Sequence, residues 1–398
     1  MLHDYDIIII GGGMVGGSLA LALRHSNIRV AIVEAKGVVE KKSDTTGKRA
    51  IALSWGSRCI LEQLNIWHKL RELAMPIRHI HVSDKGHFGK TRLSAETQQV
   101  DALGYVIEAS QIESVVSDGL DAENIDVLCP ATLEGYVIDQ DGVHVTIKQG
   151  RTSKALSCGL LVGADGGLSK VREQGAFDLK EYAYQQHAIT GVLTTESDVQ
   201  DVAYERFTSE GPIAMLPHFD GLYSLVWTMP STLAKEVMSL PKDQFLGRLQ
   251  SRFGQWLGEL GLSGERQTFP LNLSYVQDSA LNRVILIGNA AHQLHPVAGQ
   301  GFNLGLRDAA ILADILLEQQ GANADELCEI YARRRKTDQA LITGFTDNII
   351  KLFSTDRALF SVARNSGLLM LDKVPVLKNQ FARQTMGLGS RLARLKVS

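Results

Sequence analysis

The chain has 398 residues, more than one typical core of roughly 100 to 200 residues, so we expect two domains, one of which can be discontinuous. It is 44% hydrophobic and 21% charged with a net charge of -3, which is ordinary for a folded protein and gives no reason to expect nucleic acid as a partner.

The cysteine spacing and the lack of long apolar runs restrict the location of the protein. No C-x-x-C pair occurs, so we expect neither a metal site nor a disulfide framework, and a reducing cytoplasm fits best. The N-terminus does not have the pattern of a signal peptide, and no apolar run approaches the ~18 to 20 residues of a spanning helix. Any membrane contact is therefore expected to be peripheral. The four cysteines are Cys59, Cys129, Cys158 and Cys328.

The chain begins with a βαβ pattern. Asp6 to Ile10 is a β-branched run, Met14 to Arg24 has apolar residues at helical spacing, and Val30 to Val33 is a second strand. Between these strands, Gly11, Gly13 and Gly16 form G-x-G-x-x-G at the head of the helix. Glycines there permit a tight turn and bring backbone N–H groups close to a pyrophosphate.

Glu34 ends the second strand, where a carboxylate can accept hydrogen bonds from a ribose diol. A simple glycine turn with a surface glutamate is the alternative. The fingerprint alone indicates a dinucleotide and does not distinguish NAD from FAD.

The rest of the chain alternates between sheet and helix patterns. The helical and strand-like spacing of apolar residues becomes irregular between about Leu70 and Asp101. The segment from Tyr182 to Tyr275 has a strand-like pattern, which predicts a separate sheet. A buried strand is expected at Arg283 to Ile287, and helices are expected at Gly305 to Glu318 and Asp325 to Phe353.

Two further segments decide the cofactor. The segment from Leu160 to Ser169 reads LLVGADGGLS, with Arg172 beyond it, and the segment from Leu286 to Gly305 reads LIGNAAHQLHPVAGQGFNLG. Together with the fingerprint, they resemble the FAD-binding class A flavoprotein monooxygenases, the family of para-hydroxybenzoate hydroxylase, over about residues 5 to 345.

The resemblance implies an α/β fold with a Rossmann-type FAD domain, a substrate-binding sheet domain and C-terminal helices. The expected boundaries are 1–70, 100–178 and 280–345 for the FAD domain, 71–99 and 179–279 for the sheet domain, and 346–398 for the helical region.

The resemblance also assigns cofactor residues. Asn289 stands where the family has the ribityl-binding aspartate of its Gly-Asp pair; an amide keeps an acceptor oxygen, and a mere helix cap is the alternative. Arg49 matches an arginine near the FAD phosphates, with a surface ion pair as the alternative. Backbone N–H groups at Phe302 and Asn303 are expected at the flavin pyrimidine, and the Pro296 carbonyl at the substrate hydroxyl. The other residues expected around FAD and the flavin ring are Asp165, Gly288, Gly299, Gln300 and Gly301.

The wall of the substrate pocket is expected on the covering sheet. The candidates are Pro217, His218, Tyr223 and Trp227, although alternation on a half-buried strand explains them equally well. His187, His292 and His295 invite acid–base roles, but a histidine near a cofactor is more often a packing residue.

Within this family, YAYQQHAITG from Tyr182, YERFTSEGPIAMLP from Tyr204 and HPVAGQGFNLGLRD from His295 resemble the ubiquinone-biosynthesis hydroxylases, most of all the 2-octaprenyl-6-methoxyphenol hydroxylase branch. The implied activity is hydroxylation of a polyprenyl phenol with NAD(P)H and O2 through a C4a-hydroperoxyflavin. The alternatives are a sister hydroxylase acting at another ring position, a non-catalytic flavin-bound assembly protein, and a reductase or halogenase of the same fold.

The C-terminal tail, residues 373–398, is basic and has interleaved apolar residues. Such a segment suits either a peripheral contact with an anionic membrane or a partner in a ubiquinone-biosynthesis complex.

Overall fold

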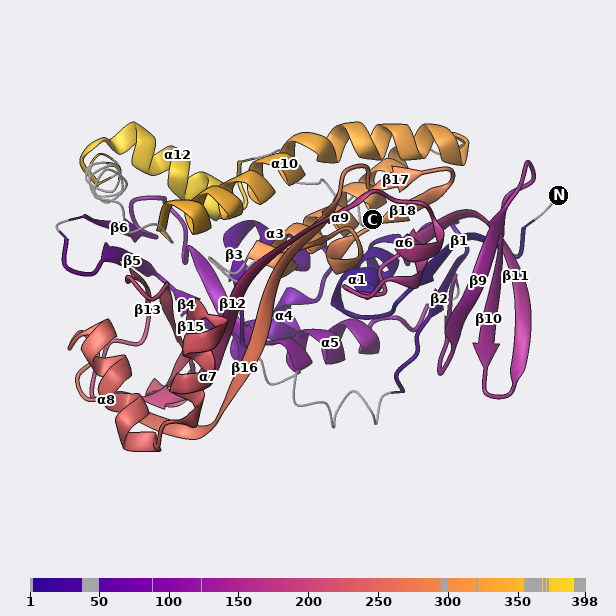
Figure 1. Ribbon diagram of the computed structural model, residues 1–398. Coiled ribbons are helices and arrows are strands. Elements are labelled where there is room, and N and C mark those ends of the chain that lie inside the picture. Colours follow the sequence, from indigo (N-terminus) through magenta and orange to yellow (C-terminus); the bar gives the residue numbers. More distant parts are fainter. Residues whose placement is uncertain are drawn as a thin grey trace.

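The structure is a computed structural model that describes residues 3–37, 50–87, 89–122, 124–294, 300–319, 321–353, 367, 370 and 372–389, with only the backbone at 184 and 340–353. It contains two large sheets, a small third sheet and helices around them (Figure 1).

The first sheet continues the N-terminal βαβ unit. Its strand order is β17-β18-β11-β1-β2-β8, with β10 paired to β11 and β9 to β10. The five strands β18, β11, β1, β2 and β8 are parallel, and the others join antiparallel. The strand bounds are β1 Tyr5–Ile10, β2 Val30–Val33, β8 Ile125–Leu128, β9 Thr132–Ile138, β10 Val143–Gln149, β11 Thr152–Gly163, β17 Ala280–Leu281 and β18 Val284–Leu286.

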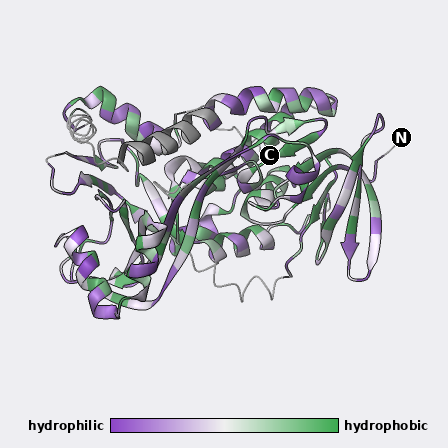
Figure 2. Cartoon of the chain, viewed as in Figure 1, coloured by the Kyte–Doolittle hydropathy of each residue, from purple (hydrophilic) through white to green (hydrophobic). Residues whose placement is uncertain are grey.

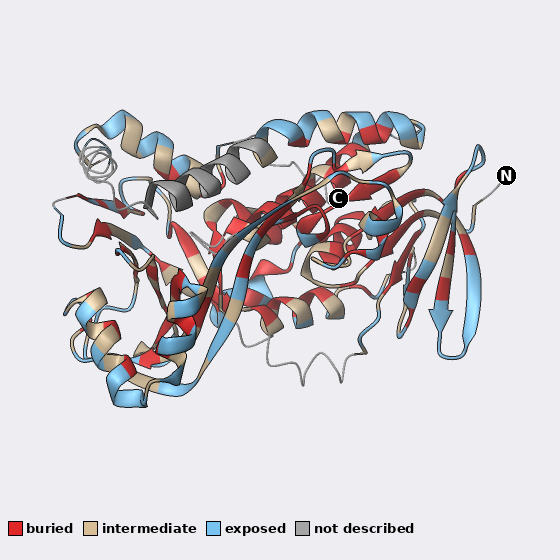
Figure 3. Ribbon diagram, in the orientation of Figure 1, coloured by how far each residue is buried: buried red, intermediate tan, exposed pale blue. Residues whose placement is uncertain are grey.

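Alternation along β1 explains why both faces of this sheet are covered. Ile7 and Ile9 pack with the helices α1, α5 and α9, whereas Ile8 and Ile10 pack with β9, β10 and α6. The helix bounds are α1 Met14–Leu23, α5 Ala109–Asp118, α6 Lys170–Gln174 and α9 Gln300–Glu318. Figure 2 shows hydrophobic residues along these central strands, and Figure 3 shows them buried.

The second sheet has the order β19-β16-β12-β15-β14-β13-β5-β6 and is antiparallel except for the β13–β5 pair. Two helices, α7 and α8, cover one of its faces and complete a separate apolar core. These helices differ from the strand-like pattern expected for this region. The bounds are β5 His79–Asp84, β6 Lys90–Ser94, β12 Leu179–Thr194, β13 Val202–Phe207, β14 Ile213–Pro217, β15 Tyr223–Pro230, β16 Gly261–Val276, β19 His292–Gln293, α7 Ser231–Ser239 and α8 Lys242–Phe253.

A third sheet, β3-β7-β4, lies between these parts and contacts α3 and α9. Helix α10 packs on α9, and α12 packs against β6 through Ala382 and Met386 (Figure 1). The remaining bounds are β3 Ala50–Ser54, β4 Met75–Ile77, β7 Gly104–Glu108, α3 Trp55–Gln63, α4 Trp67–Leu70, α10 Ala324–Phe353, α12 Pro375–Thr385, and the short 3-10 turns η2 Arg71–Leu73, η3 Phe219–Gly221 and η4 Gly288–Ala290.

Several elements match the expected ones. The βαβ unit and the helix that ends at Phe353 are confirmed, and the buried strand near residue 285 is β18. Helix α9 begins at Gln300, five residues before the expected start, so its first turn contains the glycine-rich segment. The proposed domain boundaries stay a prediction.

Candidate functional site

The three fingerprint glycines serve different purposes. Gly11 has φ +102°, and a Cβ there would lie 2.4 Å from the Ala164 carbonyl oxygen. A Cβ on Gly16 would lie 2.0 Å from the Gly11 carbonyl oxygen, so both positions require glycine for the packing of β1, α1 and β11. A Cβ on Gly13 would meet no atom of another described residue within 4 Å, and Gly13 lines a cavity. The open space before the N-terminus of α1 therefore fits a pyrophosphate.

Glu34 lies directly after β2 and faces the glycine turn. Its Oε2 accepts a hydrogen bond from the Gly12 N–H at 2.7 Å, and its Oε1 accepts one from the Lys36 N–H at 2.8 Å. The backbone thus fixes the carboxylate beside the turn, where the resemblance expects a ribose.

The second segment connects β11 to the rest of the site. Asp165 accepts hydrogen bonds from the N–H groups of Lys170 (2.8 Å) and Val171 (3.3 Å) at the start of α6. Arg172 donates to the carbonyls of Gly167 (2.6 Å) and Ala290 (2.8 Å), so it ties the second segment to the third. The other carboxylate oxygen of Asp165 is buried and has no hydrogen-bond partner among the described residues. Such an acceptor fits a ligand that carries hydroxyl donors.

The third segment turns sharply after β18. Gly288 has φ +60°, and its N–H donates to the Asp308 carboxylate at 3.0 Å. Asn289 is exposed and lines the cavity. It lies inside η4, whose N-cap is Ile287, so its side chain does not cap that turn. This placement leaves the amide open toward the cavity.

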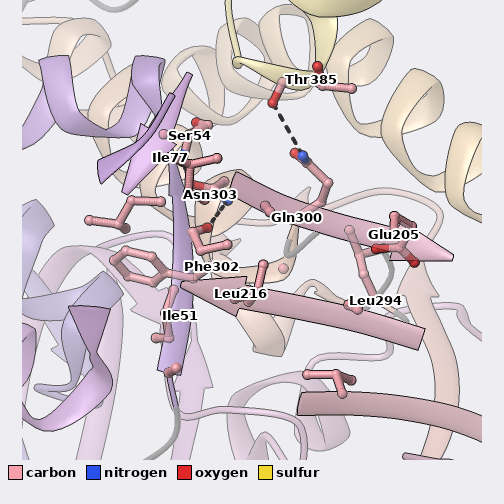
Figure 4. Close-up of a pocket in the computed structure, with 18 of the residues that line it drawn as sticks. Ile51, Ser54, Ile77, Glu205, Leu216, Leu294, Gln300, Phe302, Asn303 and Thr385 are labelled. Atoms are coloured by element: carbon pink, nitrogen blue, oxygen red, sulfur yellow. Dashed lines mark hydrogen bonds between the residues drawn. The ribbon is translucent and has the colours of Figure 1, made fainter. Parts of the chain in front are cut away.

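Asn303 anchors the start of α9. Its Oδ1 accepts from the Ser54 N–H (2.8 Å) and the Ser57 hydroxyl (2.6 Å), and its Nδ2 donates to the Ala52 carbonyl (2.8 Å). The side chain therefore holds β3 and α3 against α9. Gln300 donates to the Thr385 carbonyl at 3.4 Å and links α9 to α12 (Figure 4). Gly301 and Phe302 line the cavity beside them, and the first turn of α9 directs its partial positive charge toward this part of the site.

A buried ionic network around Asp308 holds the third segment in place. Asp308 accepts hydrogen bonds from His292 (2.6 Å) and Arg335 (2.8 Å) as well as from Gly288. The charges on Arg335 and His292 and the hydrogen bonds outweigh burial and hold the pKa of Asp308 well below its usual range. His292 thus has a positioning role. The sequence contained Asp308 in the LRD triplet but gave no indication of Arg335, because these residues lie 27 positions apart.

A single cavity of about 1090 Å³ joins these segments to the second sheet. Gly13, Gly166 and Asn289 line one part of it, and α9 lines the next. The apolar part is lined by alternate residues of several strands and by α12. These residues include Ile80, Val82, Leu93, Ala188, Thr190, Ala203, Glu205, Ala214, Leu216, Val226, Phe381 and Met386.

The expected pocket wall needs a correction. Tyr223 and Trp227 are fully buried on the opposite face of the sheet, in the core under α7 and α8, and Pro217 pairs with Tyr223 on that face. The wall is formed instead by their neighbours Leu216 and Val226, because successive side chains of a strand point to opposite faces. His218 follows β14, with its ring 4.0 Å from Glu108, and does not line the cavity.

Four of the residues discussed above, Arg49, His295, Pro296 and Gly299, lie outside the described residues. Within the described part of the chain, no helix is long and apolar enough to cross a membrane, and no group of three or more acidic, histidine or cysteine side chains could hold a metal ion.

Comparison with known proteins decides the family. The family described as an FAD binding domain matches residues 4–345. Ubiquinone hydroxylase UbiL of Rhodospirillum rubrum is 33% identical over 392 residues, which cover 96% of this chain and 89% of that protein. The chain belongs to the FAD-binding monooxygenase family. The 3-demethoxyubiquinol 3-hydroxylase of Escherichia coli is 28% identical and covers 96% of this chain and 98% of its own.

The fold agrees with this membership. The crystal structure of p-nitrophenol 4-monooxygenase PnpA from Pseudomonas putida DLL-E4 covers 98% of this chain and 100% of its own with a TM-score of 0.78, at 17% identity. The expected α/β, para-hydroxybenzoate-hydroxylase-like fold, the FAD cofactor and the monooxygenase class are thus confirmed. The family is that of the class A flavin hydroxylases of ubiquinone biosynthesis.

Proposed function

We propose that this flavin hydroxylase adds a hydroxyl group to the aromatic ring of a polyprenyl phenol in ubiquinone biosynthesis, with NAD(P)H as the electron donor and O2 as the oxygen source. The observation that supports this most is the continuous cavity, which joins the three FAD segments to a long apolar wall. A phenol ring with an apolar chain matches that lining, and two relatives carry ubiquinone-pathway names.

In this proposal, each segment holds one part of FAD. The turn at Gly13 and the α1 N–H groups bind the pyrophosphate, and Glu34 binds the ribose. Asn289 binds the hydroxyls of the ribityl chain, and Asp165 lies in the shell around the cofactor, near the pyrophosphate. The first turn of α9, at Phe302 and Asn303, donates to the flavin ring and favours negative charge there. When bound, FAD supplies the electron transfer from NAD(P)H and the activation of O2.

The apolar wall has a chemical purpose in this proposal. Because Ala188, Ala214, Leu216 and Val226 offer no hydrogen bonds, water is poorly held in that part of the cavity. A dry cavity protects the activated oxygen from water and leaves the ring of the substrate as its target. The small side chains leave room for an aromatic ring.

The test is substrate-stimulated NAD(P)H oxidation by the FAD-loaded chain, with the product identified by mass spectrometry. Hydroxylated polyprenyl phenol formed in step with NAD(P)H consumption supports the proposal. Oxidation coupled to a product other than a hydroxylated ring, or no oxidation with any polyprenyl phenol, contradicts it; the latter favours a non-catalytic assembly protein. Complementation of strains that each lack one ubiquinone hydroxylase identifies the ring position and separates the 2-octaprenyl-6-methoxyphenol reaction from its sisters.

Peripheral membrane contact through residues 373–398 also stays a proposal. Some apolar side chains of this segment are buried in the protein and are not available to a membrane, because Ala382 and Met386 pack against β6. Val376 on the same helix is 73% exposed and remains available to a membrane or a partner. Vesicle co-sedimentation of the full chain and a Val376→Asp variant tests this contact, and equal sedimentation of the two would contradict it.

A further inference from the structure

Glu205 is an acidic residue in the apolar part of the cavity. It lies on β13, where Ala203, Glu205 and Phe207 face the cavity and the alternate residue Tyr204 packs in the core under α8. Figure 4 shows its carboxylate on the cavity side, near Leu294 and Gln300. The strand alternation therefore places a titratable group on the wall that receives the substrate in the proposed function.

The neighbours of Glu205 on the adjacent strands are apolar. Its partners on the adjacent strands are Val82 on β5 and Ala214 on β14, and both line the cavity. Among the described residues, none forms a hydrogen bond or an ion pair with this carboxylate, and burial alone raises its pKa to about 7.

No described charge compensates this carboxylate from the elements around it. His81 pairs with Arg92 on the opposite face of the sheet, and Arg206 stacks on Trp256 on that side. The side chains that α9 and α12 contribute to the lining are uncharged. These are Gln300, Phe302 and Asn303 from α9 and Phe381, Thr385 and Met386 from α12. Among the described residues, the other titratable residues that contact the cavity are Glu113 and Tyr204, and Tyr204 packs in the core under α8 as well.

We propose that Glu205 binds the ring hydroxyl of the phenol and accepts its proton. This inference rests on the proposed function. In the step, the phenolic O–H bond breaks, its electron pair stays on the ring oxygen, and the proton forms a new O–H bond on the Glu205 carboxylate. The ring becomes more electron-rich and reacts faster with an electrophilic oxygen, and the carboxylic acid returns the proton to solvent after product release.

This assignment explains why a carboxylate is present on an otherwise apolar wall. A half-buried carboxylate that no described side chain compensates costs stability, and an apolar side chain at this position would not have that cost. A phenol hydroxyl supplies the missing hydrogen-bond donor. The assignment also predicts that hydroxylation becomes faster as the pH rises. Only the ionised form of Glu205 accepts a proton, and this form dominates above a pH of about 7.

The decisive experiment compares the FAD-loaded wild type with Glu205→Gln between pH 5.5 and 9, using 2-methoxy-6-geranylphenol as the probe and measuring kcat/KM for hydroxylated product. For the wild type we expect a rise of about tenfold per pH unit below a pH of about 7 and a plateau above it. For Glu205→Gln we expect no inflection in this range and a value about a hundredfold lower at pH 8. A Glu205→Gln variant that keeps the wild-type profile and rate would overturn the assignment.

Glu265→Gln is the matched control, because Glu265 is an exposed carboxylate on β16 of the same sheet. It should reproduce the wild-type profile. All variants are compared at equal FAD content and with matching circular dichroism, so that misfolding is recognised before activity is interpreted.

A binding measurement separates this inference from the proposed function. At pH 8 the FAD-loaded wild type should bind the probe about tenfold tighter than its O-methyl ether, because the ether has no proton to donate. Glu205→Leu should lose this preference. If the preference exists and is lost in the variant, Glu205 binds the hydroxyl even where no hydroxylated product forms and the proposed function fails. Equal binding of phenol and ether by the wild type overturns the assignment whatever the activity.

Discussion

A substitution at Gly13 should affect cofactor binding without affecting folding. Because no atom of the described residues that flank the turn in space lies within 4 Å of its missing Cβ, Gly13→Val should fold but place a side chain in the space of the pyrophosphate. We expect a folded protein with no measurable FAD, as checked by circular dichroism and by absorbance after gel filtration. Gly16→Ala, in contrast, should fail to fold, since its Cβ would lie 2.0 Å from a backbone oxygen.

Gly247 is the control for this prediction. It is exposed in α8, its Cβ would also meet nothing within 4 Å in the described part of the chain, and it does not line the cavity. Gly247→Val should keep normal FAD content. A folded Gly13→Val protein with normal flavin content would show that the pyrophosphate lies elsewhere.

Substitutions at Asn289 test whether the third segment binds the ribityl chain of FAD. If its amide holds ribityl hydroxyls, Asn289→Asp should retain FAD, because an acceptor of the same shape remains. Asn289→Leu should weaken FAD binding by about tenfold to a hundredfold, since a buried hydroxyl loses a partner at a cost of roughly 1 to 3 kcal/mol. Equilibrium titration of apoprotein with FAD measures both values. Equal affinities for Asn and Leu would remove the residue from the site.

At the scale of elements, the pairing of α9 with α10 depends on a buried carboxylate. Asp308→Asn removes the charge that faces Arg335, and both residues are fully buried. We expect the free energy of unfolding to fall by about 3 to 5 kcal/mol, because a buried guanidinium loses a partner. Urea unfolding at pH 7 measures this change. Glu318→Gln is the control, since Glu318 and Arg334 form an exposed ion pair between the same helices, and it should change stability by about 0.5 kcal/mol at most.

The Asp308 carboxylate should also make the free energy of unfolding depend on pH in the acid range. The pKa of Asp308 is lower in the folded protein than in the unfolded chain, so its contribution is present above the unfolded pKa and is lost as the pH falls toward the folded one. The difference in unfolding free energy between wild type and Asp308→Asn should therefore shrink as the pH is lowered from about 5 to 3. A difference that stays constant over this range would contradict the ionic role.

Some elements of this site were predictable from the sequence, and the reason is local. The turn from β1 to α1 requires glycine at Gly11 and Gly16 for steric reasons, so the spacing of these two residues predicts where the turn lies. The pocket wall was not predictable in the same way. Alternation along β15 shows that Tyr223 and Val226 face opposite sides but does not show which side is the core. Only the packing of α7 and α8, which the strand-like pattern did not predict, buries Tyr223 and leaves Val226 at the cavity.

At the scale of the whole molecule, the site exists because distant segments meet. Arg172 joins the second and third segments through the carbonyls of Gly167 and Ala290, and Asn303 joins α9 to β3. Motif order along the chain suggested that these segments share one cofactor. It could not give the contacts of Arg172 with Ala290 and of Asn303 with Ser54, because hydrogen bonds between residues more than 100 positions apart leave no local pattern.

FAD should bind this assembly reversibly and stabilise it. Among the described residues that line the cavity there is no cysteine and no histidine, the side chains that tether flavins covalently in other proteins. Acid precipitation should therefore release the flavin into the supernatant, and flavin in the pellet would contradict this. Because FAD contacts the folded chain, FAD at a hundredfold excess over its Kd should raise the free energy of unfolding by about 2.7 kcal/mol. FMN lacks the adenosine and pyrophosphate that Glu34 and the turn at Gly13 are expected to hold. At the same concentration it should stabilise the protein far less, and equal stabilisation by FMN would show that the N-terminal turn contributes little to cofactor binding.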